Sequence, residues 1–178
     1  MIMRGPVFFI LLASCLLATL TCIQEGSIPI AKASPEVYQG DLTLTDNNVT
    51  IIEDRRFDIN GSIIVEENAT LILRNAVLNF AQIEDFEFNM TFRNPAEGNP
   101  RLLVENATIT ANGYLLTIVF YGNSSASIDN LTALEIIMSV CESSVVSISN
   151  STIYYIPIEE NSNVTVSNSS VDYLDSFD

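Results

Sequence analysis

Two clusters in the sequence combine carboxylates with arginines, the groups that could carry acid–base chemistry or hold a calcium ion. Their members are Asp54, Arg55, Arg56 and Asp58 and, further along the chain, Glu84, Asp85, Glu87 and Arg93. A catalytic pair of carboxylates must face each other across a cleft, which spacing alone does not establish. The favoured interpretation of the first cluster is structural. We expect its residues to form a charged and solvated corner between two strands.

The rest of the composition excludes most other types of catalytic or metal site. The chain has no histidine, and Lys32 is its only lysine, so Ser–His–Asp triads, Cys–His pairs and histidine metal sites are excluded. Cys141 is the only cysteine after residue 22, so it has no partner for an intrachain disulfide once the leader is removed. Its apolar neighbours predict a small buried residue. We therefore expect no enzyme and no cofactor, with calcium as the open exception.

An apolar leader occupies residues 1–33. A basic flank precedes the apolar run Val7–Ile23, and Ala31–Ala33 offers small residues at a cleavage site, as in a signal peptide. Alternatively, residues 5–23 remain as a membrane tether, since about 20 apolar residues span a bilayer. A lipobox at Leu12–Cys15 is less favoured, because more apolar residues follow it. All three alternatives predict an extracellular or cell-surface protein.

The charge of the remaining chain is strongly acidic. The whole sequence has 7 basic and 22 acidic residues, and removing two basic residues and one acidic residue with the leader leaves 5 − 21 = −16. Such a surface repels phosphate backbones, so we expect no nucleic-acid partner. The expected partners are extracellular glycans or other surface proteins.

An asparagine in the pattern Asn-x-Thr/Ser, followed by an apolar residue, recurs along the chain. Its six positions are Asn48, Asn68, Asn106, Asn130, Asn150 and Asn168. The gaps are 20, 38, 24, 20 and 18 residues, and one insertion at about 81–100 explains the longest gap. A period near 20 is typical of a fold that stacks one structural repeat on the next.

Short alternating strands flank these asparagines, as at Ala126 and Ile128 or Val146 and Ile148. Alternation predicts strands with one inward face, and strands this short need neighbours in a stack. After a linker at 34–40, residues 41–178 are therefore expected to form about six coils of ~20 residues. In the first two repeats the apolar positions are shifted by one residue, which a bulge would reconcile.

The repeated Asn-x-Thr-Ile with a preceding Val-Ser-Ile-Ser strand resembles the right-handed parallel β-helix repeat proteins, in particular secreted surface proteins of archaea and bacteria. The likeness covers about Gly40 to Asp178. It implies an all-β, right-handed parallel β-helix. The family includes polysaccharide lyases, hydrolases and adhesins, so the resemblance leaves the function open.

The recurring asparagines have two interpretations. As corner residues they would stack in an inward column, with side-chain amides bonded as a ladder. As glycosylation signals they would carry sugars, together with four sequons outside the register. These four, which we expect to be the better acceptors, are Asn60, Asn89, Asn123 and Asn163.

The insertion contains an alternating aromatic strand. Phe86, Phe88, Met90 and Phe92 alternate with polar residues. Either this apolar face packs on the coil, or Phe86, Phe88 and Phe92 form an exposed ridge that binds sugars or a partner. At the C-terminal coil, the end of the stack is either covered by its own apolar side chains, continued in a longer array, or used for end-to-end association.

These observations favour a secreted or cell-surface β-helix with a structural, adhesive or glycan-binding role and no catalysis. The alternative is a carbohydrate-active enzyme, a lyase or hydrolase, that uses carboxylates with calcium. The absence of histidine and the small number of basic residues favour the first hypothesis.

Overall fold

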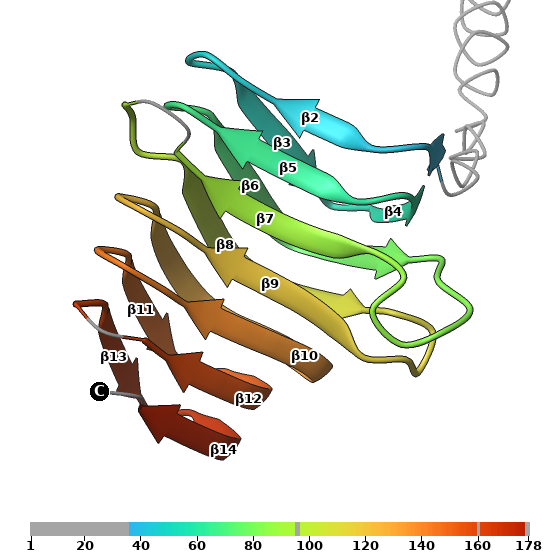
Figure 1. Ribbon diagram of the computed structural model, residues 1–178. Helices are drawn as coiled ribbons and strands as arrows, with labels where there is room; N and C mark the ends of the chain where they lie inside the picture. The colour runs from blue at the N-terminus through green and yellow to red at the C-terminus, as the bar shows by residue number, and fades with distance from the viewer. Residues whose placement is uncertain (1–35, 95–96, 160, 177–178) are drawn as a thin grey trace, which may run out of the picture. The chain divides into compact units, whose positions relative to one another are not determined.

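The computed structural model describes residues 36–94, 97–159 and 161–176. They form an all-β solenoid of about seven turns, in which each strand pairs in parallel with strands of the neighbouring turns (Figure 1). This confirms the expected parallel β-helix. The predicted leader and tether lie outside the described residues. Within those residues, no helix is long and apolar enough to cross a membrane.

The described part of the chain contains fourteen strands. In chain order they are β1 (Glu36–Gln39), β2 (Leu42–Leu44), β3 (Val49–Glu53), β4 (Arg56–Asn60), β5 (Ile63–Glu66), β6 (Thr70–Phe80), β7 (Asn89–Arg93), β8 (Arg101–Thr110), β9 (Leu116–Phe120), β10 (Ser125–Val140), β11 (Val145–Ser149), β12 (Thr152–Ile158), β13 (Asn163–Ser167) and β14 (Ser170–Ser176).

The strands stack in three columns, which we call faces 1, 2 and 3 in the order the chain visits them. Face 1 contains β3, the first parts of β6, β8 and β10, and then β11 and β13. Face 2 contains β1, β4 and the following parts of the long strands. Face 3 contains β2, β5, β7, β9 and the last parts of β10, β12 and β14. Long strands therefore turn a corner and pair on both sides of it, although β10 and β12 shift register between Ala133 and Ile137.

The repeat length varies more than the sequence pattern suggests. Successive face 1 strands are 21, 31, 24, 20 and 18 residues apart. The structure has about seven turns and not six, because β1 and β2 form a partial turn before the first repeat. Residues 36–39, expected within a linker, are thus a strand that pairs with β4.

The predicted insertion at 81–100 is only partly an insertion. β7 lies inside it, yet β7 pairs with β5 and β9 as a regular strand of face 3. The additional residues of the 31-residue turn are in the connections before and after β7. No separate element therefore protrudes from residues 89–93.

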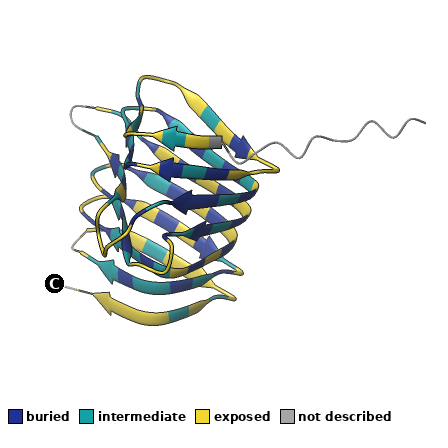
Figure 2. Ribbon diagram, turned by 90° about the vertical axis from the view of Figure 1, so that its right-hand side faces the viewer, coloured by how far each residue is buried: buried dark blue, intermediate teal, exposed yellow. Residues whose placement is uncertain are grey.

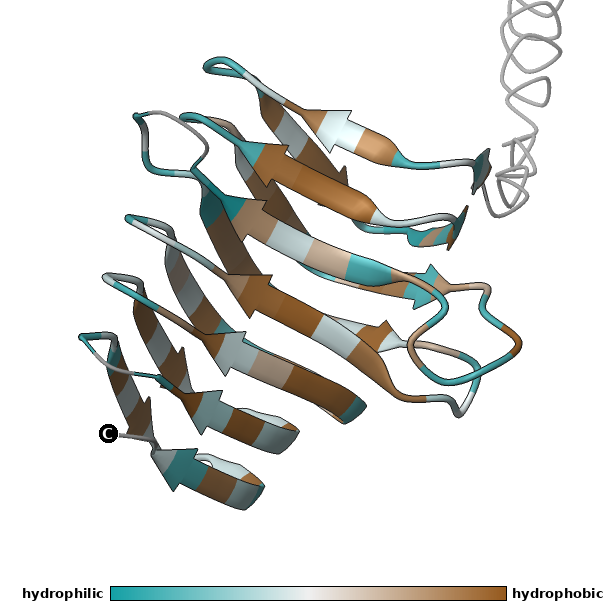
Figure 3. Cartoon of the chain, in the orientation of Figure 1, coloured by the Kyte–Doolittle hydropathy of each residue, from teal (hydrophilic) through white to brown (hydrophobic). Residues whose placement is uncertain are grey.

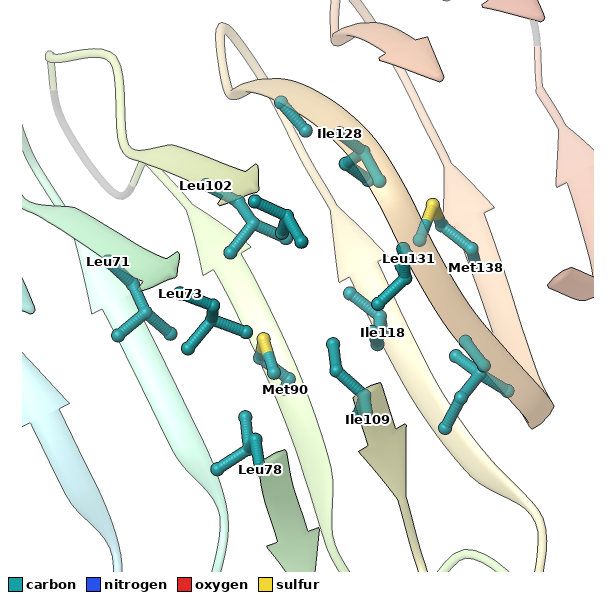
Figure 4. Packing of buried hydrophobic residues seen from close by; sticks show 14 of the residues in the cluster. Leu71, Leu73, Leu78, Met90, Leu102, Ile109, Ile118, Ile128, Leu131 and Met138 are labelled. Atoms are coloured by element: carbon teal, nitrogen blue, oxygen red, sulfur yellow. The ribbon is translucent and has the colours of Figure 1, made fainter. Parts of the chain in front are cut away.

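The core consists of rows of apolar side chains that lie above one another in successive turns. On face 1, Ile52, Leu73, Val104, Ile128 and Ile148 are paired in register and almost fully buried. Figure 4 shows the interior packing of Met90, Ile118 and Met138, which form the matching row of face 3. Parallel in-register pairing explains these rows, because an inward position stays inward in every turn.

Burial alternates with exposure along the strands of the middle turns (Figure 2), and hydrophobic and polar residues alternate in the same way (Figure 3). The last turn differs, since almost all of β14 is exposed. Each inward row gains van der Waals contact from the turns on both sides. The final row has one such neighbour in the described chain and is packed less completely.

Buried serines join successive turns at the connection from face 3 to face 1. Ser124 and Ser144 are fully buried, and their Oγ atoms lie 3.0 Å apart. Ser144 Oγ also donates to the carbonyl of Cys141, 2.7 Å away. These bonds satisfy two hydroxyls that would otherwise lose water without compensation.

Ser144→Ala is therefore expected to lower the free energy of unfolding by about 1–3 kcal/mol, because it leaves the Ser124 hydroxyl buried without its partner. Urea unfolding followed by circular dichroism measures this. Ser143→Ala, at the exposed neighbouring position, is the control and should change the value by less than about 0.5 kcal/mol. Equal effects at the two positions would contradict the role given to the buried pair.

Candidate functional site

One corner of every turn, between faces 1 and 2, is occupied by a residue with a left-handed backbone. The six residues have φ between 46° and 55°, and they are Asp54, Asn75, Asn106, Asn130, Asn150 and Asn168. Asparagine and aspartate adopt this conformation more readily than other side chains. The backbone conformation of the corner is therefore enough to explain why asparagine or aspartate occurs there.

The corner side chains bond from turn to turn. Asn75 Nδ2 donates to Asp54 Oδ1 at 3.0 Å, Asn106 to Asn75 at 2.9 Å, and Asn130 to Asn106 at 3.0 Å. Asn150 continues the contact by donating to Asp129 Oδ1 at 2.7 Å. This bond, with a second from Ser149, lowers the pKa of Asp129. An amide ladder thus runs along the corner from Asp54 to Asn130, and Asn150 bonds to the residue beside that corner.

Two of the sequence-predicted corner residues lie elsewhere. Asn48 and Asn68 belong to the turns between faces 3 and 1, where Asn68 Oδ1 accepts from the backbone N–H of Asn99 at 3.1 Å. Asp54 and Asn75 occupy the corner in those two repeats. The expected bulge is therefore unnecessary, because the apparent shift came from comparing two different turns.

The corner column faces solvent, contrary to the expected inward orientation. The side chains of Asn106, Asn130, Asn150 and Asn168 are all exposed. In Asn106-Ala-Thr-Ile the alanine and isoleucine are buried, while the threonine points outward. The tripeptide pattern thus encodes a surface corner and a strand with one inward face.

The sequon hydroxyls form a second surface column beside the asparagines. Thr108, Thr132, Thr152 and Ser170 are paired in register on face 2. Adjacent strands lie about 4.8 Å apart, so hydroxyls and amides repeat at that spacing along the outside. We call these two rows the amide–hydroxyl columns.

The first charged cluster is used within the fold. Asp54 accepts the corner bond from Asn75, and Arg56 pairs with Asp58 at 2.9 Å. The guanidinium of Arg55 lies 5.6 Å from the centre of the Phe57 ring. The cluster is thus a charged corner, as the favoured interpretation of the sequence has it.

The second cluster is spread over several contacts. Asp85 Oδ1 accepts from the backbone N–H of Leu115, and Glu87 Oε2 from that of Ile83, both at 2.8 Å. Arg93 pairs with Glu66 of the preceding turn at 2.7 Å, and Glu84 is exposed. Across residues 36–94, 97–159 and 161–176, no three acidic or thiol side chains gather as a metal site would require.

The aromatic strand of the insertion does not form an exposed ridge. Phe92 is fully buried and stacks on Phe120 with ring centres 4.8 Å apart, and Phe88 packs against the core. Phe86 is exposed, but it lies outside β7 in the preceding loop. The alternating face therefore packs inward, as the first of the two interpretations predicts.

Cys141 is buried, with 2 % of its surface exposed. Burial raises its pKa to about 12, and the carboxylates of Glu159 and Glu142 act in the same direction. The thiol is therefore protonated at neutral pH and belongs to the interior.

An open cavity of about 260 Å³ lies at the C-terminal turns, and the sequence analysis missed it. Its lining residues are Tyr154, Tyr155, Tyr173 and Asp175. The hydroxyl of Tyr155 donates to Asp175 Oδ2 at 3.0 Å. Partial burial, together with this bond, raises the pKa of Tyr155. We call this feature the tyrosine cavity.

The corner between faces 2 and 3 creates the tyrosine cavity. Ile153 and Ile156 are buried, so the two residues between them both point outward. Tyr173 of β14 pairs with Tyr155 of β12, which brings a third ring to the same place. The signal in the sequence was a tyrosine pair that interrupts the alternation in one repeat, with a tyrosine again in the next.

Comparisons with protein-family models, curated proteins and solved structures found no match to this chain. Its function is therefore inferred from its own residues.

The corner ladder predicts an unusual order of stability. Asn106→Ala removes two amide bonds and replaces asparagine, which tolerates the left-handed region, by alanine, which does not, so it should cost about 2 kcal/mol of unfolding free energy. Asn106→Gly loses the same bonds without the backbone strain and should be about 1 kcal/mol less harmful. Urea unfolding of both variants measures the difference.

The matched control is Ser127, which is exposed on face 1 and does not have a positive φ. There the usual order should return, with the alanine variant more stable than the glycine variant by about 0.5–1 kcal/mol. The same order at positions 106 and 127 would contradict the backbone argument for the corner.

Proposed function

We propose that this β-solenoid is a non-catalytic protein of the cell surface or extracellular space with a structural and adhesive role. The observation that carries the proposal is the outer surface of the coils, where exposed amides and hydroxyls repeat in register with the turns. Such a surface presents many weak polar contacts at a fixed spacing. It suits a scaffold that is displayed to other surfaces.

The use of the charged residues supports the same proposal. Arg74 bonds Glu53 on one side and Glu105 on the other, both at 2.8 Å, and so joins three successive turns. These hydrogen bonds, the one to Glu53 first, raise the pKa of Arg74. Both sequence-predicted clusters likewise make contacts that hold the coils together. The arginines Arg74 and Arg93 therefore connect neighbouring turns.

The tyrosine cavity is the proposed contact point for adhesion. Tyrosine rings offer a large contact area at a small cost in side-chain entropy, and they are enriched at binding surfaces. Tyr173 is 60 % exposed and can reach a partner without unfolding of the coil. The strongly acidic chain adds repulsion against anionic partners.

The proposed extracellular location predicts which of the sequons carry glycans. Asn123 and Asn163 are exposed, and neither side chain bonds within the described structure, so both should carry glycans. Asn106, Asn130 and Asn150 should be unmodified, because each Nδ2 donates to a neighbouring turn and adjacent corners are only about 4.8 Å apart.

Glycopeptide mass spectrometry of the protein from its own cells measures the occupancy of each sequon. Asn60 and Asn89 are exposed and remain expected acceptors, although Asn60 Nδ2 bonds to Gln39 and Asn89 Oδ1 accepts from Thr91. A glycan on Asn106, Asn130 or Asn150 would contradict the proposed pattern. Complete absence of glycans on Asn123 and Asn163 would count against the proposed extracellular location.

Adhesion is tested with beads coated with the full chain and exposed to cells of the source organism. Tyr173→Ala should reduce the number of retained beads by more than half, because it removes the exposed wall of the cavity. Tyr114→Ala changes an exposed tyrosine in the loop between β8 and β9 and should leave retention unchanged. Equal retention by the native chain and the Tyr173 variant would reject the cavity as the contact point.

A further inference from the structure

The rings of the tyrosine cavity stand at steep angles to one another. The ring centres of Tyr154 and Tyr173 are 5.7 Å apart with an interplanar angle of 79°, and those of Tyr155 and Tyr173 are 6.4 Å apart at 87°. The three rings therefore line the open cavity from different directions. A flat platform for stacking a sugar would instead need ring faces that lie side by side in one plane.

The groups that line the cavity favour a cation over an anion. The face of each aromatic ring carries the negative part of its quadrupole, and Asp175 contributes a carboxylate that Tyr155 holds by a hydrogen bond. Neither arginine nor lysine is among the lining residues. The whole chain carries a formal charge of −15, which attracts cations toward any site on it.

We propose that the tyrosine cavity binds a quaternary ammonium group, such as the head of choline or a trimethylated lysine. Three aromatic walls attract the cation through their faces, and the carboxylate neutralises its charge. The inference rests on the proposed function, because it names the chemical group that this adhesive contact point recognises.

The lining of the cavity favours a methylated ammonium over a bare one. A bare ammonium holds water strongly and needs several hydrogen-bond acceptors in exchange. The lining consists mostly of aromatic rings, and its one carboxylate already accepts a hydrogen bond from Tyr155, so it replaces little of that hydration shell. A quaternary ammonium donates no hydrogen bonds, and its methyl groups fit against aromatic carbon.

Isothermal titration calorimetry on the full chain tests the inference with two probes of nearly the same shape. Choline carries a positive nitrogen, whereas 3,3-dimethylbutan-1-ol carries a neutral carbon at the same position. We expect choline to bind at least about tenfold more tightly than the neutral alcohol. Raising the salt concentration should weaken choline binding, since the exposed carboxylate is screened.

Variants identify the groups responsible. Tyr173→Ala should weaken choline binding about tenfold, whereas Tyr173→Phe keeps the ring and should bind as the native chain does. Asp175→Asn should weaken binding and reduce its dependence on salt. Tyr114→Ala is the control for an exposed tyrosine outside the cavity, and the urea midpoint of each variant checks that the fold is retained.

The result that would overturn the inference is equal affinity for choline and its neutral isostere, or tighter binding of a methyl glucoside than of choline. Either result would assign the cavity to a neutral ligand and leave the adhesive function in place. No binding of choline by the native chain would also reject the inference. By contrast, bead retention that does not depend on Tyr173 would reject the adhesive contact itself.

Discussion

The whole solenoid depends on the left-handed corner between faces 1 and 2. There the chain must change direction once per turn while both flanking strands keep their pairing with the turns above and below. A single residue with φ near 50° achieves this, and asparagine both tolerates the conformation and, as at Asn130, donates to the corner of the preceding turn. Because the corners are fixed in one column, the strand positions that flank them are also fixed in columns. The aliphatic core rows, the arginine bridges and the amide–hydroxyl columns are consequences of that register.

The sequence predicted the solenoid well because its periodic signal reflects this corner. Asn106, Asn130, Asn150 and Asn168 were assigned to one repeated position, and they share it in the structure. The prediction of the corner residue was wrong in the first two repeats, because the corner requires only a backbone conformation and not the complete Asn-x-Thr/Ser motif. Asp54 meets that requirement without an asparagine, and Asn75 meets it without a following threonine. Conversely, Asn48 and Asn68 have the motif but lie in the connections between faces 3 and 1. The same sequence motif therefore does not mark the same structural position there.

The candidate site was less accessible to sequence reasoning, because a strand pattern does not state which face points inward. Phe88 and Phe92 alternate as an exposed aromatic ridge would, but pairing of β7 with both neighbours turns that face to the core. The tyrosine cavity depends on the opposite effect. Two outward residues in succession mark a corner, and a third ring joins them only because Tyr173 lies one turn further along at the same position as Tyr155.

The type of aromatic residue explains why the rings of the C-terminal turns lie outside. The turns of 21, 31 and 24 residues bury Phe57, Phe80, Phe92 and Phe120. The 20- and 18-residue turns that follow contain no phenylalanine, and their inward positions are aliphatic, as at Ala126, Ala133 and Ile156. A tyrosine at such a position would overpack the aliphatic row, and its hydroxyl would also need a buried partner. The rings of Tyr154, Tyr155 and Tyr173 therefore lie outside, at the corner where the cavity forms.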